Sequence, residues 1–370
     1  MENDAPYLLM TPGPLTTSPS VKHAMLHDLS TWDDDYNEIV QSIRERLVAL
    51  AGAADELTAV LLQGSGTFAI ESTLGSVVPP DGKLLIASNG AYGSRMTEIA
   101  ERLRIQHTEL KFAETEVCDL NALDAALAGD AAVTHVALVH CETTTGLLND
   151  AAGAGVIVGR HGRSLIVDAM SSFGGIPMTM DELGADYLIS SANKCIQGVP
   201  GFAFVIARRR AIESTAGRAR SLSLDLYGQW REMETHGGKW RYTSPTHVVL
   251  AFAQALQELA DEGGVAARCA RYSDNQRRLV DGMARLGIQA LLPRKMQSPI
   301  ITSFLYPQPE FDFRCFYLAM KRRGFVLYPG KISQAPTFRI GTIGHVFPAD
   351  IDRLLIAAEA ALAETGVAIG

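Results

Sequence analysis

A lysine and an aspartate lie at the ends of two successive apolar runs. Asp168 ends the run Leu165–Val167, and Lys194 comes 26 residues later, after the run Tyr187–Ile189. If the two runs are adjacent strands, their C-terminal ends place an amine and a carboxylate in one crevice. Pyridoxal phosphate chemistry needs such a pair, a lysine for the Schiff base and an aspartate for the pyridinium nitrogen. Taken alone, a solvated surface lysine and a turn-opening aspartate explain the pair more simply.

A short glycine-rich loop lies between an earlier strand-like run and a helical run. Its residues are Gly64, Ser65, Gly66 and Thr67. Glycines let the backbone approach an anion, and N–H groups at a helix start hold it, with the Ser65 and Thr67 hydroxyls as further donors. A plain tight turn with a capping hydroxyl is the alternative. No Gly-Lys-Ser/Thr follows, which excludes a Walker loop, so the loop suits the phosphate of a permanently held cofactor.

Two further strand ends carry groups that suit a planar cofactor. Tyr92 lies between Gly90 and Gly93, and its ring could cover the face of a cofactor, although a core or interface tyrosine fits equally. Thr143 opens a run of three threonines after the next strand, where a polar turn is the alternative. Four strand ends in this order, before Lys194, are hard to explain as unrelated turns.

Composition indicates a soluble globular protein with a large core, and argues against nucleic acid as the main partner and against a membrane protein. The chain has 370 residues, of which 47% are hydrophobic and 20% charged, and its net charge is −8. The five cysteines are odd in number and form no Cys-x-x-Cys, which fits a reducing compartment. We find no signal peptide, membrane span or metal-binding motif, so we expect a cytoplasmic protein without a metal.

Alternating strand and helix patterns predict an α/β fold with a second, smaller α+β part. We expect an extended N-terminal segment at 1–20, a large α/β domain at 21–263 and a small C-terminal α+β domain at 264–370. The prolines at positions 12, 14 and 19 argue against a helix in the first segment. The strands expected in the large domain are 59–62, 83–87, 133–139, 165–167, 187–189 and 202–206. Such continuous apolar runs are typical of mostly parallel sheets between helices.

The chain resembles a known family over essentially its whole length. The segments that carry the resemblance include Thr-Pro-Gly-Pro at 11–14, Trp-Asp-Asp-Asp-Tyr at 32–36, Asp-Ala-Met-Ser-Ser at 168–172 and Ser-Ala-Asn-Lys-Cys at 191–195. They are similar to those of the fold-type I, class V aminotransferases, and within these to the branch that acts on 2-aminoethylphosphonate and pyruvate. The resemblance implies a pyridoxal 5'-phosphate enzyme with Lys194 and Asp168 as catalytic residues.

The same resemblance implies further residues and a partner. It implies a homodimer with shared active sites, in which Tyr242 and Thr243 reach the phosphate of the neighbouring subunit's cofactor. It assigns Arg339 to the acid group of the substrates, and it places the N-terminal segment, with Gly13 and Thr16, along that pocket. Without the resemblance, a surface salt bridge would be the simpler interpretation of Arg339.

Other functions compete with this prediction. Within the class, the alternative is an alanine–glyoxylate or serine–pyruvate aminotransferase, which binds a small acid beside the same cofactor. A nicotinamide-dependent oxidoreductase using the loop at 64–67 lacks an acidic residue for the ribose, because position 87 is Ala. A non-catalytic binding module leaves the spacing of Asp168 and Lys194 unexplained. His23 and His27 are spaced as metal ligands but lack a third partner, so a helix face is the preferred interpretation.

Overall fold

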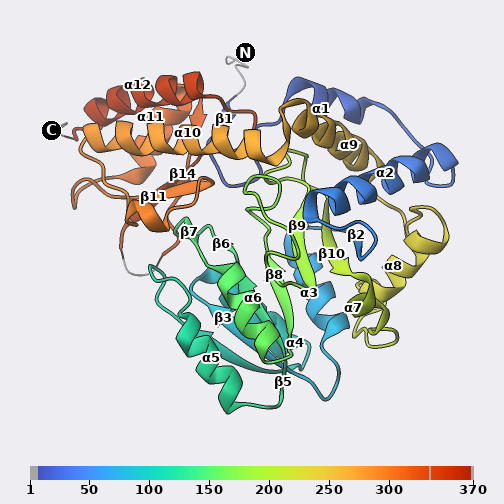
Figure 1. Ribbon diagram of the computed structural model, residues 1–370. Coiled ribbons are helices and arrows are strands. Elements are labelled where there is room, and N and C mark those ends of the chain that lie inside the picture. Colours follow the sequence, from blue (N-terminus) through green and yellow to red (C-terminus); the bar gives the residue numbers. More distant parts are fainter. Residues whose placement is uncertain (1–6, 333–334, 368–370) are drawn as a thin grey trace.

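A seven-stranded sheet forms the centre of the larger part of the molecule (Figure 1). The computed structural model describes residues 7–332 and 335–367. Neighbouring strands of this sheet pair in parallel, except that β10 runs antiparallel to both of its neighbours. In order across the sheet, the strands are β2 (Leu57–Gln63), β10 (Phe202–Arg208), β9 (Tyr187–Ser191), β8 (Ser164–Asp168), β5 (Val133–Val139), β3 (Lys83–Ser88) and β4 (Gln106–Lys111).

Helices and a small hairpin surround this sheet. Strand β9 is buried along its whole length, so the sheet is covered on both faces there, as its continuous apolar sequence predicts. The surrounding elements are α1 (Pro19–His23), the 3-10 turn η1 (Ala24–Leu26), α2 (Asp34–Ala51), α3 (Gly66–Val77), α4 (Ala91–Arg102), α5 (Leu120–Gly129), β6 (Cys141–Glu142), β7 (Leu147–Leu148), α6 (Ala151–Arg160), α7 (Arg209–Glu213), α8 (Leu226–Thr235) and α9 (Thr246–Asp261).

The C-terminal part has its own sheet and its own hydrophobic cluster. Its elements are α10 (Gly264–Arg285), η2 (Arg294–Met296), β11 (Ile301–Leu305), α11 (Phe313–Arg322), β12 (Phe325–Val326), β13 (Tyr328–Pro329), β14 (Thr337–Gly341) and α12 (Pro348–Glu364). The strand order of the three-stranded sheet in this part is β11-β14-β13. The N-terminal β1 (Leu8–Leu9) pairs in parallel with β12 in a separate two-stranded sheet. The domain limits at 20 and 263 stay a prediction.

Three local expectations were incomplete or wrong. Strand β4 was missed, because this edge strand is only half-buried and its sequence, Gln-His-Thr-Glu-Leu-Lys, has no apolar run. Pro19 begins helix α1 rather than continuing an extended segment, since proline is well suited to a first helical position. His23 and His27 do not share a helix face, because α1 ends at His23 and His27 follows η1 in an extended conformation.

The described residues include no helix with the length and hydropathy needed to cross a membrane.

Helix α6 offers a matched pair of glycines that tests its packing. A Cβ added at Gly155 would lie 1.9 Å from the carbonyl oxygen of Leu183, whereas one at Gly159 would meet nothing within 4 Å. We predict that Gly155→Ala lowers the free energy of unfolding by about 1–3 kcal/mol or more, because the backbone must move apart. Gly159→Ala should raise it by about 0.5–1 kcal/mol through helix propensity. Urea denaturation measures both, and equal effects would contradict the close approach of α6 to Leu183.

Candidate active site

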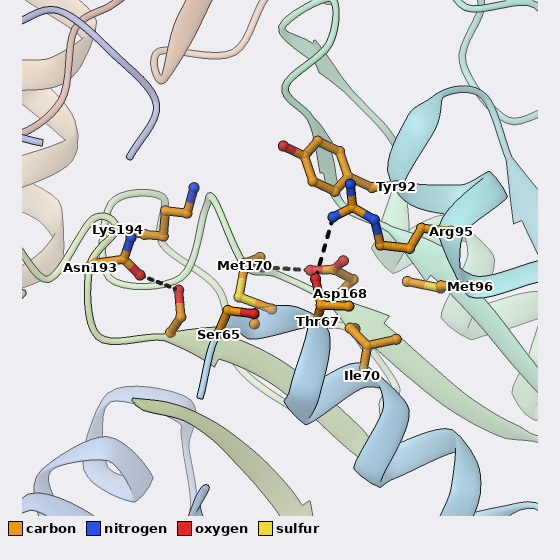
Figure 2. Close-up of a pocket in the computed structure, with 12 residues that line it drawn as sticks. Ser65, Thr67, Ile70, Tyr92, Arg95, Met96, Asp168, Met170, Asn193 and Lys194 are labelled. Carbon is orange, nitrogen blue, oxygen red and sulfur yellow. Dashed lines mark hydrogen bonds between the residues drawn. The ribbon is translucent and has the colours of Figure 1, made fainter. Parts of the chain in front are cut away.

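The pairing of β8 with β9 brings Asp168 and Lys194 to the same edge of the sheet. The two strands are parallel neighbours, with Asp168 opposite Ile189, and Lys194 follows β9 by three residues. Both side chains line one cavity of roughly 200 Å³ (Figure 2). The sequence prediction that one crevice holds an amine and a carboxylate is confirmed by this geometry.

Lys194 enters the cavity against the N-terminal segment. Its Nζ donates a hydrogen bond to the carbonyl oxygen of Pro12 at 3.0 Å. A Cβ added at Gly13 would lie 2.8 Å from the same Nζ, so only a glycine leaves room for the amine there. Desolvation by the surrounding protein lowers the pKa of Lys194 to about 8, although Cys195 and Asp168 favour the charged form. A sizeable share of the amine is therefore neutral near pH 8.

Asp168 is a buried carboxylate with one strong local partner. It is 4% exposed, and its Oδ1 accepts a hydrogen bond from the Met170 backbone N–H at 2.8 Å. Burial raises its pKa to about 7, and this effect outweighs the hydrogen bond and the attraction of Lys194 and Arg95. A cation placed beside this carboxylate would restore its charged form.

The N-terminus of α3 forms an anion cup at the cavity. β2 ends at Gln63, Gly64 turns the chain with φ +115°, and Ser65 precedes the helix without capping it by its side chain. The first N–H groups of α3 and the hydroxyls of Ser65 and Thr67 therefore face the cavity as donors. A Cβ at Gly66 would lie 2.3 Å from Sδ of Met170, which explains the glycine.

Tyr92 lies in the first turn of α4 and lines the cavity. Its backbone N–H donates to Oε2 of Glu142 at 3.1 Å. Arg95, one turn further along α4, places its guanidinium carbon 5.1 Å from the Tyr92 ring centroid, and its Nη1 lies 3.4 Å from Oγ1 of Thr67. Figure 2 shows Arg95 pointing into the cavity beside Tyr92. Sequence reasoning missed Arg95, although its spacing from Tyr92 on one helix face is a usable signal.

The side chain of Arg339 contacts the backbone carbonyl of Thr143. Arg339 is 6% exposed; its Nη1 donates to the carbonyl oxygen of Thr143 at 2.9 Å, and its Nε donates to that of Pro329 at 3.0 Å. The surface salt bridge is excluded, because this guanidinium is buried and has no ion pair in the described residues. The Thr143 hydroxyl is buried without a hydrogen-bond partner in the described structure, although Thr143 does not line the cavity.

Besides Gly13, Thr143 and Arg339, three further expected site residues do not line the cavity. Tyr242, which is 51% exposed, and Thr243 line a separate hollow of about 520 Å³ together with Gly64 and Phe68. The Thr16 hydroxyl accepts a hydrogen bond from the Leu9 N–H at 2.8 Å and so holds the N-terminal segment itself. The roles expected of these three residues stay predictions.

Several cavity residues were not expected. They lie on the helices and strand ends already described. Three of them, Arg95, Ser191 and Asn193, have polar side chains. The Ser191 hydroxyl donates to Oδ1 of Asn193 at 3.1 Å, which fixes the turn that leads to Lys194. The complete set of unexpected lining residues is Ile70, Arg95, Met96, Met170, Ser191 and Asn193.

Comparisons with known proteins agree with this geometry. The profile of the aminotransferase class-V family matches residues 16–339. A 2-aminoethylphosphonate–pyruvate transaminase of Syntrophobacter fumaroxidans is 63% identical over 362 residues, which cover 98% of each chain. One from Phocaeicola vulgatus is 60% identical over 352 residues, or 95% of this chain and 97% of the relative.

Solved structures share the fold. A pyridoxamine–pyruvate aminotransferase from Mesorhizobium loti superposes with a TM-score of 0.91 at 23% identity, covering 100% of this chain and 95% of that one. An alanine–glyoxylate aminotransferase from Nostoc sp. gives 0.90 at 25% identity, covering 98% and 97%. The predicted fold class and the resemblance are thereby confirmed. The chain belongs to the class-V aminotransferases and has the fold-type I architecture.

Proposed function

We propose that the protein transfers the amino group of 2-aminoethylphosphonate to pyruvate, giving phosphonoacetaldehyde and L-alanine, in phosphonate degradation. The observation that carries the proposal is the shared cavity of Lys194 and Asp168, an amine and a carboxylate that burial drives toward their neutral forms. The choice of substrates rests on the relatives named as transaminases of these two compounds, at 63% and 60% identity.

Pyridoxal 5'-phosphate is the cofactor that fits the residues present. The N-terminus of α3, with Ser65, Gly66 and Thr67, would hold its phosphate, and Asp168 would hold its ring nitrogen. The hydroxyl of Thr143 is unpartnered in the described structure but does not line the cavity, so its role at the cofactor's polar edge stays a prediction. When bound, this cofactor supplies the electron sink for moving an amino group between two carbon skeletons.

Lys194 combines two properties that the reaction needs. Its lowered pKa, about 8, makes a neutral amine available to act as a nucleophile and to move a proton. The Pro12 carbonyl oxygen, which accepts its hydrogen bond, orients the amine toward the cavity. Gly13 lies against the same side chain and keeps that space free.

Arg339 would bind the acid group of each substrate in turn. Two backbone carbonyls hold its guanidinium in place, and its remaining N–H groups are available for a carboxylate or a phosphonate. Because the substrates of a transamination enter one after the other, a single buried arginine serves both acids.

A homodimer with shared active sites is part of the proposal. Tyr242 and Phe68 are half-exposed aromatic residues beside Gly64, at the end of the strand that leads to the phosphate loop. Buried apolar rings are favoured at interfaces between subunits. A second copy covering this hollow would bring Tyr242 and Thr243 of one subunit toward the phosphate of the neighbouring subunit's cofactor. We place the enzyme in the cytoplasm, where its five free cysteines stay reduced.

The first test compares amino donors on the purified protein. With pyridoxal phosphate and pyruvate, we expect 2-aminoethylphosphonate to give a kcat/KM at least about 100-fold above L-serine, and phosphonoacetaldehyde as product. With glyoxylate as acceptor, L-alanine should react poorly. Lys194→Ala should abolish turnover, whereas the exposed Lys295→Ala should not. A preference for L-alanine and glyoxylate, or an active Lys194→Ala variant, would refute the assignment.

Arg339→Lys tests the acid site. The lysine keeps the charge but loses the planar fork, so we predict a rise in KM of about 10- to 100-fold for 2-aminoethylphosphonate and for pyruvate, as for the loss of one hydrogen bond to a charged group. Arg210→Lys, on the exposed side of α7, is the control. Unchanged KM values for both substrates would place the acid-binding site elsewhere.

Asp168→Asn tests the pH dependence of stability in protein freed of ligands. The folded pKa of Asp168, about 7, lies above its unfolded value of about 3.9, so its stabilising effect is complete below pH 3.9 and is lost as pH rises to 7. Relative to the wild type, the variant should become steadily more stable between pH 4 and 8, by several kcal/mol in all. Urea denaturation of both proteins across this range measures the difference, and a constant difference would contradict the buried carboxylate.

A further inference from the structure

Three cationic side chains gather around the ring of Tyr92. The Arg95 guanidinium carbon lies 5.1 Å from the ring centroid, and Nζ of Lys331 lies 5.2 Å from it. Arg339 is close enough to both Tyr92 and Lys331 to interact with them electrostatically. Arg95 comes from α4, whereas Lys331 and Arg339 come from the strand β14 and the segment before it, so the cluster joins the two parts of the chain.

Among the described residues, none of the three cations forms an ion pair within 4.0 Å. The buried Glu142 attracts Lys331 and Arg339 electrostatically, but both of its carboxylate oxygens already accept hydrogen bonds. Oε2 accepts from the Tyr92 N–H at 3.1 Å, and Oε1 accepts from the hydroxyl and N–H of Thr144 at 2.7 and 3.1 Å. Like charges this close repel one another unless an anion lies between them.

The pKa of Lys331 records this repulsion. Burial lowers it first, and the positive charges of Arg95 and Arg339 lower it further. The Lys331 side chain is nevertheless exposed, so its amine is accessible to an anion from solvent that approaches the ring of Tyr92. The cluster of Arg95, Lys331 and Arg339 therefore favours the binding of an anion.

Arg339 alone matches a carboxylate better than a phosphonate. Two of its five N–H groups are already donated to Pro329 and Thr143. A carboxylate has two oxygens and one negative charge, whereas a phosphonate has three oxygens and up to two charges. Binding the second acid in the same place therefore needs further donors and a further positive charge.

We propose that Arg95 and Lys331 are specificity residues that bind the additional oxygen and charge of a phosphonate, while Arg339 binds both acids. The inference rests on the proposed function, since it assumes a phosphonate donor. Within one site, Arg339 would set the position of the acid group of either substrate. Arg95 and Lys331, which both lie over the ring of Tyr92, would favour the doubly charged phosphonate. Figure 2 shows the Arg95 guanidinium beside the ring of Tyr92, over which Lys331 also lies.

Single-turnover measurements on the holoenzyme test the division. Each amino donor alone changes the cofactor's absorbance, so the apparent Kd of 2-aminoethylphosphonate and of L-alanine can be measured separately. For Arg95→Gln and for Lys331→Gln we expect the Kd of the phosphonate to rise at least about tenfold more than that of L-alanine, as for a lost charge-assisted hydrogen bond. Arg102→Gln on the same helix and Lys295→Gln, both exposed, should leave the ratio as in the wild type.

Three results would overturn the inference. An equal loss for both donors, or a loss of cofactor absorbance, would assign Arg95 to the cofactor phosphate through its contact with Thr67. An unchanged phosphonate Kd in both variants would remove the pair from the site. A wild-type enzyme that reacts with L-alanine and not with 2-aminoethylphosphonate would refute the proposed function itself, and the two failures are therefore distinguishable.

Discussion

The parallel pairing of β8 with β9 is the constraint on which the site depends. The C-terminal ends of two adjacent parallel strands lie at the same edge of the sheet. Asp168, at the end of β8, is therefore close to the turn after β9 that leads to Lys194. The backbone continues this alignment beyond the strands, since the Ala169 N–H donates to the Ile189 carbonyl and the His140 N–H donates to that of Asp168. Neither functional residue needs a long-range side-chain contact to find the other.

Burial then gives the pair its chemistry. Taking a charge out of water costs free energy, so the same cavity raises the pKa of Asp168 and lowers that of Lys194. Their attraction for each other is weaker than this desolvation, because each remains closer to neutral than in water. The charged form of Asp168 is therefore unfavourable in this cavity. A cationic ring nitrogen beside this carboxylate would offset the cost of its desolvation, so a cofactor with such a nitrogen would bind tightly.

The sequence predicted the parts of the molecule whose signals are local. Continuous apolar runs revealed the buried strands, and the residues at their ends identified Asp168, Lys194 and the loop before α3. It could not reveal strand β4, which is half-buried, nor the meeting of Arg95 with Lys331, which lie far apart in the chain and converge only through packing of the two parts. A cation without a carboxylate partner has no signature in a single sequence.

The N-terminal segment connects strand β14, which carries Arg339, to the amine of Lys194. Met10 packs in the C-terminal hydrophobic cluster, and its carbonyl oxygen accepts the N–H of Gly341 at 2.9 Å, two residues beyond Arg339 on β14. Two residues further along the chain, the Pro12 carbonyl holds Nζ of Lys194. Gly341 must be a glycine, because a Cβ would lie 2.4 Å from the Thr11 backbone. Three residues, Met10 to Pro12, therefore connect the strand that carries Arg339 to the side chain of Lys194, so the fold of this short segment helps to set the distance between the two cationic groups.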